Sequence, residues 1–401
     1  MKPVVIVHHH EITLKGDNRP FFEQVLMRNV RTAISGLQPT PIIRGGYGRF
    51  VLELGADAHP DDVVERLRLV FGLANICSGV EVEQNIDVFC RTAGELLQGR
   101  EFKTIKVHTS RPDKRFPTSS MDVNAKVGEY LCGKFGVRAN LSEPDETVRI
   151  EIVDGVAYVY RSRIDGAGGL PVGVSGKVVS LLSAGFDSPV ASWRMMKRGA
   201  TVIFVHFHSI PYTSSDSLNQ VKQLVTVLTR YQYHSRLYLV PFAGVQQEIV
   251  LKSPESLRVI LYRRMMLRIA EAIAKQEQAE ALVTGEAVGQ VASQTLRNIR
   301  IIDSAVTYPI LRPLSGNDKE ETMSIARSIG TFEISEEPFD DCCSFLAPRR
   351  PETWAREKEV AEAEAKLEVS RLVESAMTGV SREIYHYPDN QQAHLLEISS
   401  S

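Results

Sequence analysis

The chain has 401 residues, of which 43% are hydrophobic and 24% are charged. This composition excludes collagen-like, disordered and disulfide-scaffold proteins, and the length predicts two or three domains. The 47 Lys and Arg residues nearly balance the 49 Asp and Glu residues, so any binding of nucleic acid has to come from local basic patches rather than from net charge.

Cysteine content and hydropathy indicate the compartment. Five Cys residues are an odd and sparse number, which is typical of a reducing compartment. The sequence has no apolar run long enough for a transmembrane helix and no signal-peptide pattern at its start. We therefore expect a cytoplasmic protein with no membrane partner.

The first half of the chain predicts a mixture of strands and helices. β-Branched residues predict a buried strand at 3–7, and apolar residues at helical spacing predict a helix at 21–34. Asp154 followed by Gly155 predicts a hairpin between strands at 148–153 and 156–163. The other elements expected here are a loop at 16–20, strands at 49–54 and 104–109, and helices at 61–71, 91–98 and 123–135.

A Gly-rich stretch at 166–176 is the best linker candidate, and after it strands and helices alternate. This alternation indicates a parallel, doubly wound sheet. Asp318 and Glu321 lie at capping-box spacing at the start of a helix, and residues 355–377 read as one charged helix before a polar tail. The alternating elements are strands at 178–182, 201–207, 236–242, 280–285 and 307–314, and helices at 187–198, 216–231, after 253 and at 290–299.

The most informative stretch, Ser-Ala-Gly-Phe-Asp-Ser at 183–188, joins a buried strand to a helix. Small residues let backbone N–H groups approach an anion, and a helix N-terminus adds partial positive charge. Ser183 and Ser188 can donate hydrogen bonds to phosphate, whereas Asp187 suits a Mg²⁺ ion. The Gly-Lys-Ser/Thr ending of the Walker loop is absent. The alternative is an ordinary strand–turn–helix joint built from small residues.

This stretch resembles the S-G-G-x-D-S loop of the PP-loop ATP pyrophosphatases, which split ATP between the α and β phosphates and adenylate a substrate oxygen. The departure is Ala184, where the family usually has Gly. If this position requires a positive φ, alanine costs ~1 kcal/mol or more.

Five further stretches narrow the resemblance, and they occur in order at 11–23, 263–274, 281–295, 311–321 and 340–345. Together with the loop they resemble the tRNA 4-thiouridine synthetases, which are sulfurtransferases also used in thiamine biosynthesis. The resemblance implies an α/β chain built from α+β domains and a doubly wound parallel-sheet domain. The implied domains are a ferredoxin-like domain at 1–59, a THUMP RNA-binding domain at 60–165, a linker at 166–176, and a PP-loop ATP pyrophosphatase domain with a C-terminal helix at 177–401.

The resemblance also implies an ATP site in which the strand ends meet. Arg263 is always charged and suits phosphate, and His206 and Gly285 fall at strand ends on the edge that carries the loop. The implied ATP-binding residues are Leu181, Leu182, Ser183, Gly185, Asp187, Ser188, His206, Phe207, Arg263, Gly285 and Gln294. The alternatives are a buried core histidine for His206, a solvated helix residue for Arg263 and a simple turn for Gly285.

Cys342 and Cys343 form the second chemical centre of the sequence. A thiolate that carries persulfide sulfur should be exposed and have a lowered pKa. In the family the position that matches Cys343 carries the catalytic cysteine, so Asp187 and Cys343 are the implied catalytic residues, with ATP and Mg²⁺ as the implied cofactors. Neighbouring Asp340 and Asp341 disfavour thiolate formation. The alternative is a pair of buried thiols that act as small hydrophobic residues.

Some family members end in a rhodanese domain with its own persulfide cysteine. No Cys follows Cys343 here, so the chain resembles the short form, which takes sulfur from a separate cysteine desulfurase. The resemblance further implies a thiazole sulfur-carrier protein as a partner, and a homodimer. No metal site is predicted at 8–10, because successive His residues on a strand face opposite sides.

A local excess of Lys and Arg between residues 100 and 116 indicates an RNA-binding surface. The stretch at 111–117 also matches the THUMP pattern. The implied tRNA-binding residues are Lys15, Arg28, Lys106, Arg111, Lys114 and Arg115. The alternative for each is a solvated charge, and recognition of shape and backbone fits better than base reading.

The sequence therefore predicts an ATP-dependent tRNA sulfurtransferase that makes 4-thiouridine at tRNA position 8. Three alternatives stay open: a PP-loop enzyme of another specificity, a non-catalytic RNA-binding protein with a decayed loop, and an enzyme used mainly for thiazole synthesis.

Overall fold

The structure is a computed structural model that describes residues 1–9, 11–46, 48–55, 57–338, 346, 348, 350–388 and 394–396. The chain divides into two compact units, Met1–Leu170 and Pro171–Ser401. The division falls inside the Gly-rich stretch at 166–176. Within the described residues, no helix combines the length and the apolar character needed to cross a membrane.

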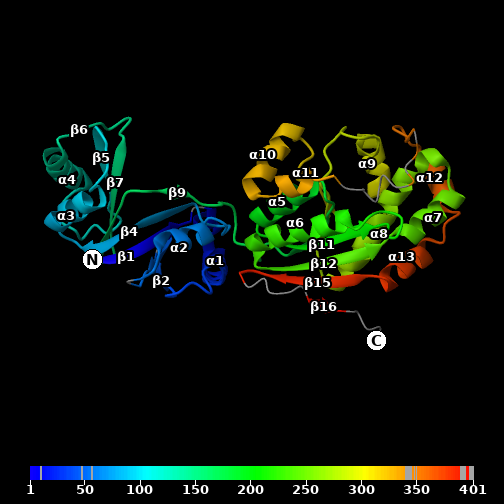
Figure 1. Cartoon of the computed structure of the whole chain (residues 1–401), viewed down its shortest axis with the longest axis horizontal. Helices are drawn as coiled ribbons and strands as arrows, with labels where there is room; N and C mark the ends of the chain where they lie inside the picture. The colour runs from blue at the N-terminus through cyan, green and yellow to red at the C-terminus, as the bar shows by residue number, and fades with distance from the viewer. Residues whose placement is uncertain are drawn as a thin grey trace. The chain divides into compact units, whose positions relative to one another are not determined.

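The first unit is built on one sheet in the order β2-β3-β1-β4-β8-β7-β5-β6, with β9 also paired to β4 (Figure 1). Helix α2 packs against β1 and α1, whereas α3 and α4 pack together beside β5. The strands are β1 (Lys2–His8), β2 (Ile42–Gly46), β3 (Arg49–Glu53), β4 (Asn75–Glu83), β5 (Thr104–Ser110), β6 (Arg138–Ala139), β7 (Glu146–Val153), β8 (Val156–Tyr160) and β9 (Ile164–Asp165). The helices are η1 (Glu11–Asn18), α1 (Arg19–Ala33), α2 (Pro60–Leu67), α3 (Ile86–Leu96) and α4 (Ser120–Phe135).

The predicted hairpin is confirmed, because Asp154 and Gly155 join β7 to β8 with φ values of 50° and 81°. Both values lie in the left-handed region that a two-residue hairpin turn needs. The predicted loop at 16–20 is wrong, because η1 ends at Asn18 and α1 begins at Arg19. A proline in the first turn of α1 suits a helix start, since its missing N–H has no partner there.

Strands β2 and β4 are absent from the sequence prediction. β4 pairs with β1 on one side and with β8 on the other, so it joins the two halves of the sheet. Gly79 interrupts its β-branched pattern, and a Cβ there would lie 2.6 Å from the carbonyl oxygen of Val159 on β8. The glycine is needed for this close approach of two backbones, a contact that the local sequence does not reveal.

The second unit contains a sheet in the order β14-β13-β10-β11-β12-β15-β16. The strands from β14 to β12 are parallel, as predicted, whereas β15 pairs antiparallel with β12 at the other edge. The strands are β10 (Lys177–Leu181), β11 (Thr201–His208), β12 (His234–Pro241), β13 (Ala281–Val283), β14 (Ile310–Leu311), β15 (Ser381–His386) and β16 (His394–Leu396). The polar tail, for which the sequence analysis predicted no element, therefore contributes two strands to this sheet.

Helices cover both faces of this sheet (Figure 1). α5 and α6 pack on one face together with α10 and α11, and α8 packs on the other with α7, α9, α12 and α13. The helices are α5 (Asp187–Lys197), α6 (Asp216–Gln232), α7 (Ala243–Lys252), η2 (Glu255–Leu257), α8 (Arg258–Glu277), η3 (Ala292–Gln294), α9 (Leu296–Asp303), α10 (Lys319–Ile329), α11 (Phe332–Glu336), α12 (Glu357–Glu364) and α13 (Val369–Thr378).

The core of this unit lies between the sheet and α8. Val179 of β10, Val205 of β11 and Val240 of β12 belong to the same buried cluster as much of α8. The capping box of Asp318 and Glu321 at the start of α10 is confirmed.

The single helix predicted at 355–377 is wrong, because the chain forms α12 and α13 with a break between them. Arg264 and Arg268 of α8 both bind Glu364 in the last turn of α12. Leu367 in the break joins the core cluster, and α13 then packs on α8 and α7. Tertiary packing on α8 therefore outweighs the helical propensity of the charged segment.

Candidate functional site

A pocket lies at the carboxyl ends of β10, β11 and β13, where ligands bind in parallel sheets of this kind. Its lining includes all of the residues that the resemblance implies for ATP binding, except Gly185. The lining residues are Leu181, Leu182, Ser183, Asp187, Ser188, His206, Phe207, Arg263, Met266, Thr284, Gly285, Glu286 and Gln294.

The loop at 183–188 is closed by its two serines. The backbone N–H of Ser183 donates to Oγ of Ser188 over 2.8 Å, and the hydroxyl of Ser188 lies 3.2 Å from the carbonyl oxygen of Ser183. The two hydroxyl oxygens are 3.1 Å apart. These contacts fold the loop over the N-terminus of α5, where backbone N–H groups and the helix dipole favour an anion.

Packing behind the loop holds it in place. Phe186 stacks on Phe332 with ring centroids 5.2 Å apart, and the guanidinium of Arg327 lies 4.2 Å from the centre of the Phe332 ring. Alanine is acceptable at position 184, because the φ of Ala184 is not positive. The Ala184 side chain is buried, with 1% exposure. Gly185 has room for a Cβ, which would lie 3.7 Å from Oγ of Ser183.

Asp187 is the acidic group of the phosphate loop. Its carboxylate is half-buried, and desolvation raises its pKa above the ordinary value of 3.8, although a hydrogen bond from Gln290 opposes this rise. The Gln290 amide lies 3.4 Å from Oδ2. A carboxylate whose charge is disfavoured by burial gains from a cation beside it, so Asp187 is suited to a divalent metal ion.

Gly285 presses directly against the phosphate loop. A Cβ on this residue would lie 2.6 Å from the backbone nitrogen of Ser188 and 2.7 Å from the carbonyl carbon of Asp187. These distances are too short for real contacts and involve backbone atoms that cannot rotate away. The absence of a side chain at Gly285 therefore allows the end of β13 to lie close to the start of α5. A glycine that served only as a turn would not need this close contact.

His206 lies at the end of β11 and is 5% exposed. Its Nδ1 is 2.9 Å from the carbonyl oxygen of Leu182, an acceptor, so Nδ1 carries the proton in the neutral ring. This bond ties β11 to the entry of the phosphate loop and directs the other side of the imidazole toward the pocket.

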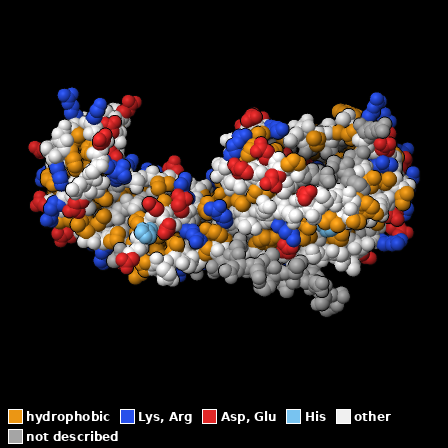
Figure 2. All heavy atoms as spheres, viewed as in Figure 1, with side chains coloured by type: hydrophobic (Ala, Val, Ile, Leu, Met, Phe, Trp, Pro, Cys, Tyr) orange, Lys and Arg blue, Asp and Glu red, His pale blue; other side chains and the backbone are white. Residues whose placement is uncertain are grey.

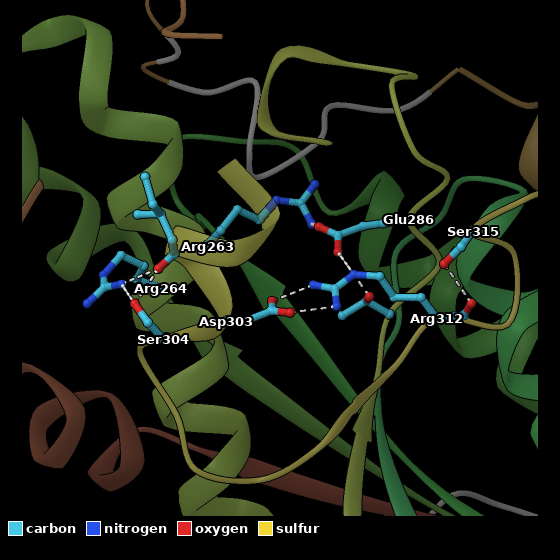
Figure 3. Close-up of polar contacts among 9 residues, drawn as sticks. Arg263, Arg264, Glu286, Asp303, Ser304, Arg312 and Ser315 are labelled. Atoms are coloured by element: carbon cyan, nitrogen blue, oxygen red, sulfur yellow. Dashed lines mark hydrogen bonds and ion pairs between the residues drawn. The ribbon is translucent and has the colours of Figure 1, made fainter. Parts of the chain in front are cut away.

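Glu286 is the main residue of the pocket that the sequence analysis missed (Figure 3). It is 5% exposed. It accepts from Nε of Arg312 at 2.8 Å, lies 3.4 Å from Nη1 of Arg263, and accepts from the Thr284 hydroxyl at 3.1 Å. Glu286 adjoins Gly285 in a stretch already singled out, but its link to Arg312 joins positions that are distant in sequence.

Arg312 in turn is fixed by Asp303, with two hydrogen bonds of 2.9 Å and 2.6 Å. Burial by itself would lower the pKa of Arg312, but its bonds to Asp303 and Glu286 raise it. Figure 3 shows Arg263 directed toward Glu286, whereas Arg264 turns to Ser304. Adjacent arginines of one helix thus have different tasks, one at the pocket and one in the packing of α12.

The residues implied for tRNA binding all lie in the first unit and differ in their surroundings. Lys114 and Arg28 are exposed, whereas Arg115 forms a bidentate pair with Asp113 at 2.9 Å and 2.8 Å. Lys106 donates to the carbonyl oxygen of Leu141 at 2.7 Å. Arg111 donates to the carbonyl oxygen of Phe116, and the ammonium of Lys15 lies 5.3 Å from the centre of the Phe22 ring.

Figure 2 shows basic side chains around α4, β5 and β6 on the face that it draws, with acidic side chains among them. The patch is therefore mixed in charge rather than uniformly basic. The catalytic candidate Cys343, with Cys342, Asp340 and Asp341, lies outside the described residues.

Comparison with known proteins decides the family. The family model "Thiamine biosynthesis protein (ThiI)" matches residues 173–369, the "ThiI ferredoxin-like domain" matches 4–77 and the "THUMP domain" matches 83–161. The chain is 41% identical over 376 residues to a probable tRNA sulfurtransferase of Thermoanaerobacter sp. (strain X514), which covers 94% of this chain and 98% of the relative. The chain belongs to the tRNA sulfurtransferase family.

Two other relatives agree with this membership. A probable tRNA sulfurtransferase of Thermus thermophilus is 40% identical over 379 residues, with 94% of this chain and 92% of the relative covered. The crystal structure of a 4-thiouridine synthetase–RNA complex with bound ATP matches with a TM-score of 0.88 and 34% identity, over 96% of this chain and 100% of that chain. The fold of the tRNA sulfurtransferases, with ferredoxin-like and THUMP domains before a parallel-sheet PP-loop domain, is thus the fold of this chain.

Proposed function

We propose that this tRNA sulfurtransferase binds ATP in the pocket described above and uses it to convert the uridine at tRNA position 8 to 4-thiouridine. The observation that carries the proposal is the pocket itself. It collects the phosphate loop, a buried histidine and a buried Arg–Glu network at one edge of the sheet. The solved 4-thiouridine synthetase with RNA and bound ATP supports the same substrates.

The phosphates of ATP fit the loop at 183–188. Backbone N–H groups at the start of α5 and the hydroxyl of Ser183 supply donors, while Arg263 supplies positive charge across the pocket. Leu182, Phe207 and Met266 offer apolar contact area for the adenine ring. Glu286 and Arg312 hold Arg263 in place, so the charge that faces the nucleotide is fixed before substrate arrives.

Asp187 is the residue that would hold Mg²⁺. The raised pKa of this carboxyl and its place beside the phosphate loop fit a divalent cation. The ion would neutralise charge on the pyrophosphate that leaves.

In the first chemical step, O4 of the uridine attacks the α phosphorus of ATP, and the bond to the β,γ-pyrophosphate breaks. The products are pyrophosphate and a uridine whose O4 carries AMP. The target base has to be turned out of the tRNA core, which costs a few kcal/mol. Basic residues of the first unit, Lys114 above all, would bind the RNA backbone during this step.

In the second step, the terminal sulfur of a persulfide on Cys343 attacks C4, and AMP leaves. The uridine is then joined to Cys343 through a disulfide. A further thiol, either Cys342 or one from outside, attacks Sγ of Cys343 and releases 4-thiouridine while a new disulfide forms. A cysteine desulfurase would supply the persulfide, and the protein would act as a homodimer.

The matching family is described as a thiamine biosynthesis protein, which favours thiamine synthesis as a second use of the same sulfur. A persulfide on Cys343 can be handed to a thiazole sulfur-carrier protein for thiamine synthesis. This use needs neither RNA nor the basic residues of the first unit. Variants that no longer bind RNA would therefore lose tRNA thiolation and keep sulfur transfer to the carrier protein.

Single-turnover thiolation of an unmodified tRNA transcript tests the proposal. The mixture contains ATP, Mg²⁺, cysteine and a cysteine desulfurase, with pyrophosphate and 4-thiouridine measured together. We expect Cys343→Ser to keep pyrophosphate release and lose 4-thiouridine, while Cys132→Ser, a control in the first unit, retains both. Binding of tRNA without either product would instead favour a non-catalytic RNA-binding protein.

A further inference from the structure

An exposed tryptophan stands beside the rim of the pocket. Trp354 is 66% exposed, although it precedes Ala355, which is fully buried. The guanidinium of Arg297 lies 5.0 Å from the centre of the indole ring. An exposed aromatic ring with an arginine over one face has no role in the core and none in the chemistry described above.

The backbone around Trp354 is held firmly in place. Nε of Arg297 donates to the carbonyl oxygen of Ala355 at 2.6 Å, and the N–H of Ala355 donates to the side chain of Asn298 at 3.1 Å. The amide of Asn298 donates to the carbonyl oxygen of Glu352 at 2.8 Å. The ring is therefore presented on a fixed frame.

The same frame continues to the pocket. The amide of Asn298 also donates to the carbonyl oxygen of Ala292 in η3, the short helix that ends with the pocket residue Gln294. Thr295 donates to the carbonyl oxygen of Thr353 at 3.0 Å. Arg297 is three positions after Gln294, so the Cα atoms of the two residues are at most about 11 Å apart.

Exposed apolar residues line this approach. Between Glu286 and Arg297, the side chains that face solvent include Val288, Val291 and Leu296, at 46%, 51% and 70% exposure. The same segment contains Gln290, whose exposed amide contacts Asp187, and the buried pocket residue Gln294. One segment thus forms the pocket wall on one side and an apolar rim on the other.

We propose that Trp354, with Arg297 behind it, is a stacking platform for an unpaired nucleotide of the tRNA that flanks the uridine entering the pocket. This inference rests on the proposed function. A uridine drawn from a polynucleotide leaves its neighbours at the pocket rim, where their bases have lost their stacking partners. A flat aromatic face next to an arginine accepts any base, because every base has a π-face.

The charge of the rim favours RNA over a protein as the occupant. Besides Arg297, three exposed arginines lie within four positions of Arg297 or Trp354 in the sequence: Arg300, Arg350 and Arg356. Three acids lie close by in the sequence. Glu352 accepts from the backbone N–H of Trp354 at 2.8 Å, and Glu357 and Glu359 are paired with Arg300 and Arg356. A phosphate backbone that passes the ring would meet these cations.

The chain has two tryptophans, which makes the test direct. Trp193 packs edge-on against Tyr231 in α5 and α6, so Trp193→Phe leaves Trp354 as the single fluorescent indole. We expect unmodified tRNA transcript to quench this fluorescence and to protect the indole from acrylamide. Trp354→Ala should weaken tRNA binding about tenfold, and Trp354→Phe should restore most of the loss.

The controls separate stacking from other effects. Trp354→Ala should leave ATP affinity and thermal stability unchanged, and Leu251→Ala, which removes an apolar side chain 79% exposed on α7, should leave tRNA binding unchanged. If the Trp193→Phe protein thiolates tRNA while the Trp354 signal stays constant, the platform is wrong and the proposed function stands. A signal that responds to a cysteine desulfurase but not to tRNA would overturn the platform in favour of protein docking. If the protein neither binds nor thiolates tRNA, both proposals fail.

Discussion

Each unit of the chain contains a buried glutamate surrounded by cationic and hydroxyl groups, yet the two glutamates differ in purpose. Glu151 in β7 is 8% exposed and Glu286 after β13 is 5% exposed. Glu151 binds His8 at 2.9 Å and the hydroxyl of Tyr160 at 2.5 Å, with Arg49 at 3.6 Å. Its partners come from β1, β8 and the start of β3, so the cluster joins strands of one continuous sheet.

Glu286, in contrast, lies at the carboxyl end of its strand and lines the pocket. Its partners Arg263 and Arg312 come from α8 and from the residue after β14. Both glutamates are buried and paired, so burial and pairing do not by themselves identify a functional site. The position at a strand end beside a phosphate loop distinguishes Glu286.

The largest effect should come from Asp187→Asn. Loss of the carboxylate should slow pyrophosphate release by at least about 100-fold. Because burial raises the pKa of Asp187, the charged form costs stability at neutral pH, and the neutral variant should melt at the same or a higher temperature. Without Mg²⁺, the difference in melting temperature between parent and variant should shrink on acidification, because Asp187 then becomes protonated. A lower melting temperature would contradict this account.

Glu286→Gln should damage both function and stability. Two arginines lose a buried counter-charge, so the second unit should lose roughly 3 kcal/mol of unfolding free energy. Arg263 would also lose its fixed orientation, and pyrophosphate release should slow about tenfold. Glu359→Gln, an exposed ion-pair residue on α12, is the control and should change stability by less than about 0.5 kcal/mol. Denaturant unfolding and single-turnover assays measure the two losses.

Glu151→Gln should weaken the fold and spare the ATP chemistry. The first unit should lose roughly 2 kcal/mol. Burial by itself would raise the pKa of Glu151, but the bonds from His8 and Tyr160 hold it below the ordinary 4.5. The charged Glu151 therefore stabilises the first unit above about pH 4.5, and this stabilisation is lost as the pH falls further. The Glu151→Gln variant should lack this dependence of stability on pH. Slower pyrophosphate release in the folded variant would break the contrast with Glu286.

The smallest effect concerns the basic residues of the first unit. Lys114→Ala should weaken tRNA binding about threefold and lower its salt dependence by about one counterion. Arg115→Ala should change less, because Arg115 is already paired with Asp113 and has to leave that carboxylate to reach a phosphate. Equal losses of tRNA affinity in the two variants would show that the Arg115–Asp113 ion pair opens when RNA binds. Binding isotherms at several salt concentrations measure both.

The phosphate loop could be predicted from one contiguous stretch, whereas the resemblance to the family supplied the pocket residues outside it. A strand, a loop of small residues and a helix follow one another at 178–198, so local rules are enough to recognise a phosphate loop. Glu286 could be reached in the same way, since it follows Gly285. Its partner Arg312 could not, because nothing in either local stretch says that the end of β14 lies beside the end of β13.

Local sequence patterns are enough to predict the strand–helix alternation, the phosphate loop, the hairpin at Asp154 and the capping box at Asp318, because each depends on neighbours a few residues apart. Local patterns do not reveal the central place of β4, the antiparallel edge strand β15, the break between α12 and α13, or the pairing of Arg312 with Glu286. These features depend on contacts between residues far apart in the chain. Their stability comes from burial and pairing that exist only once the sheet and α8 have assembled.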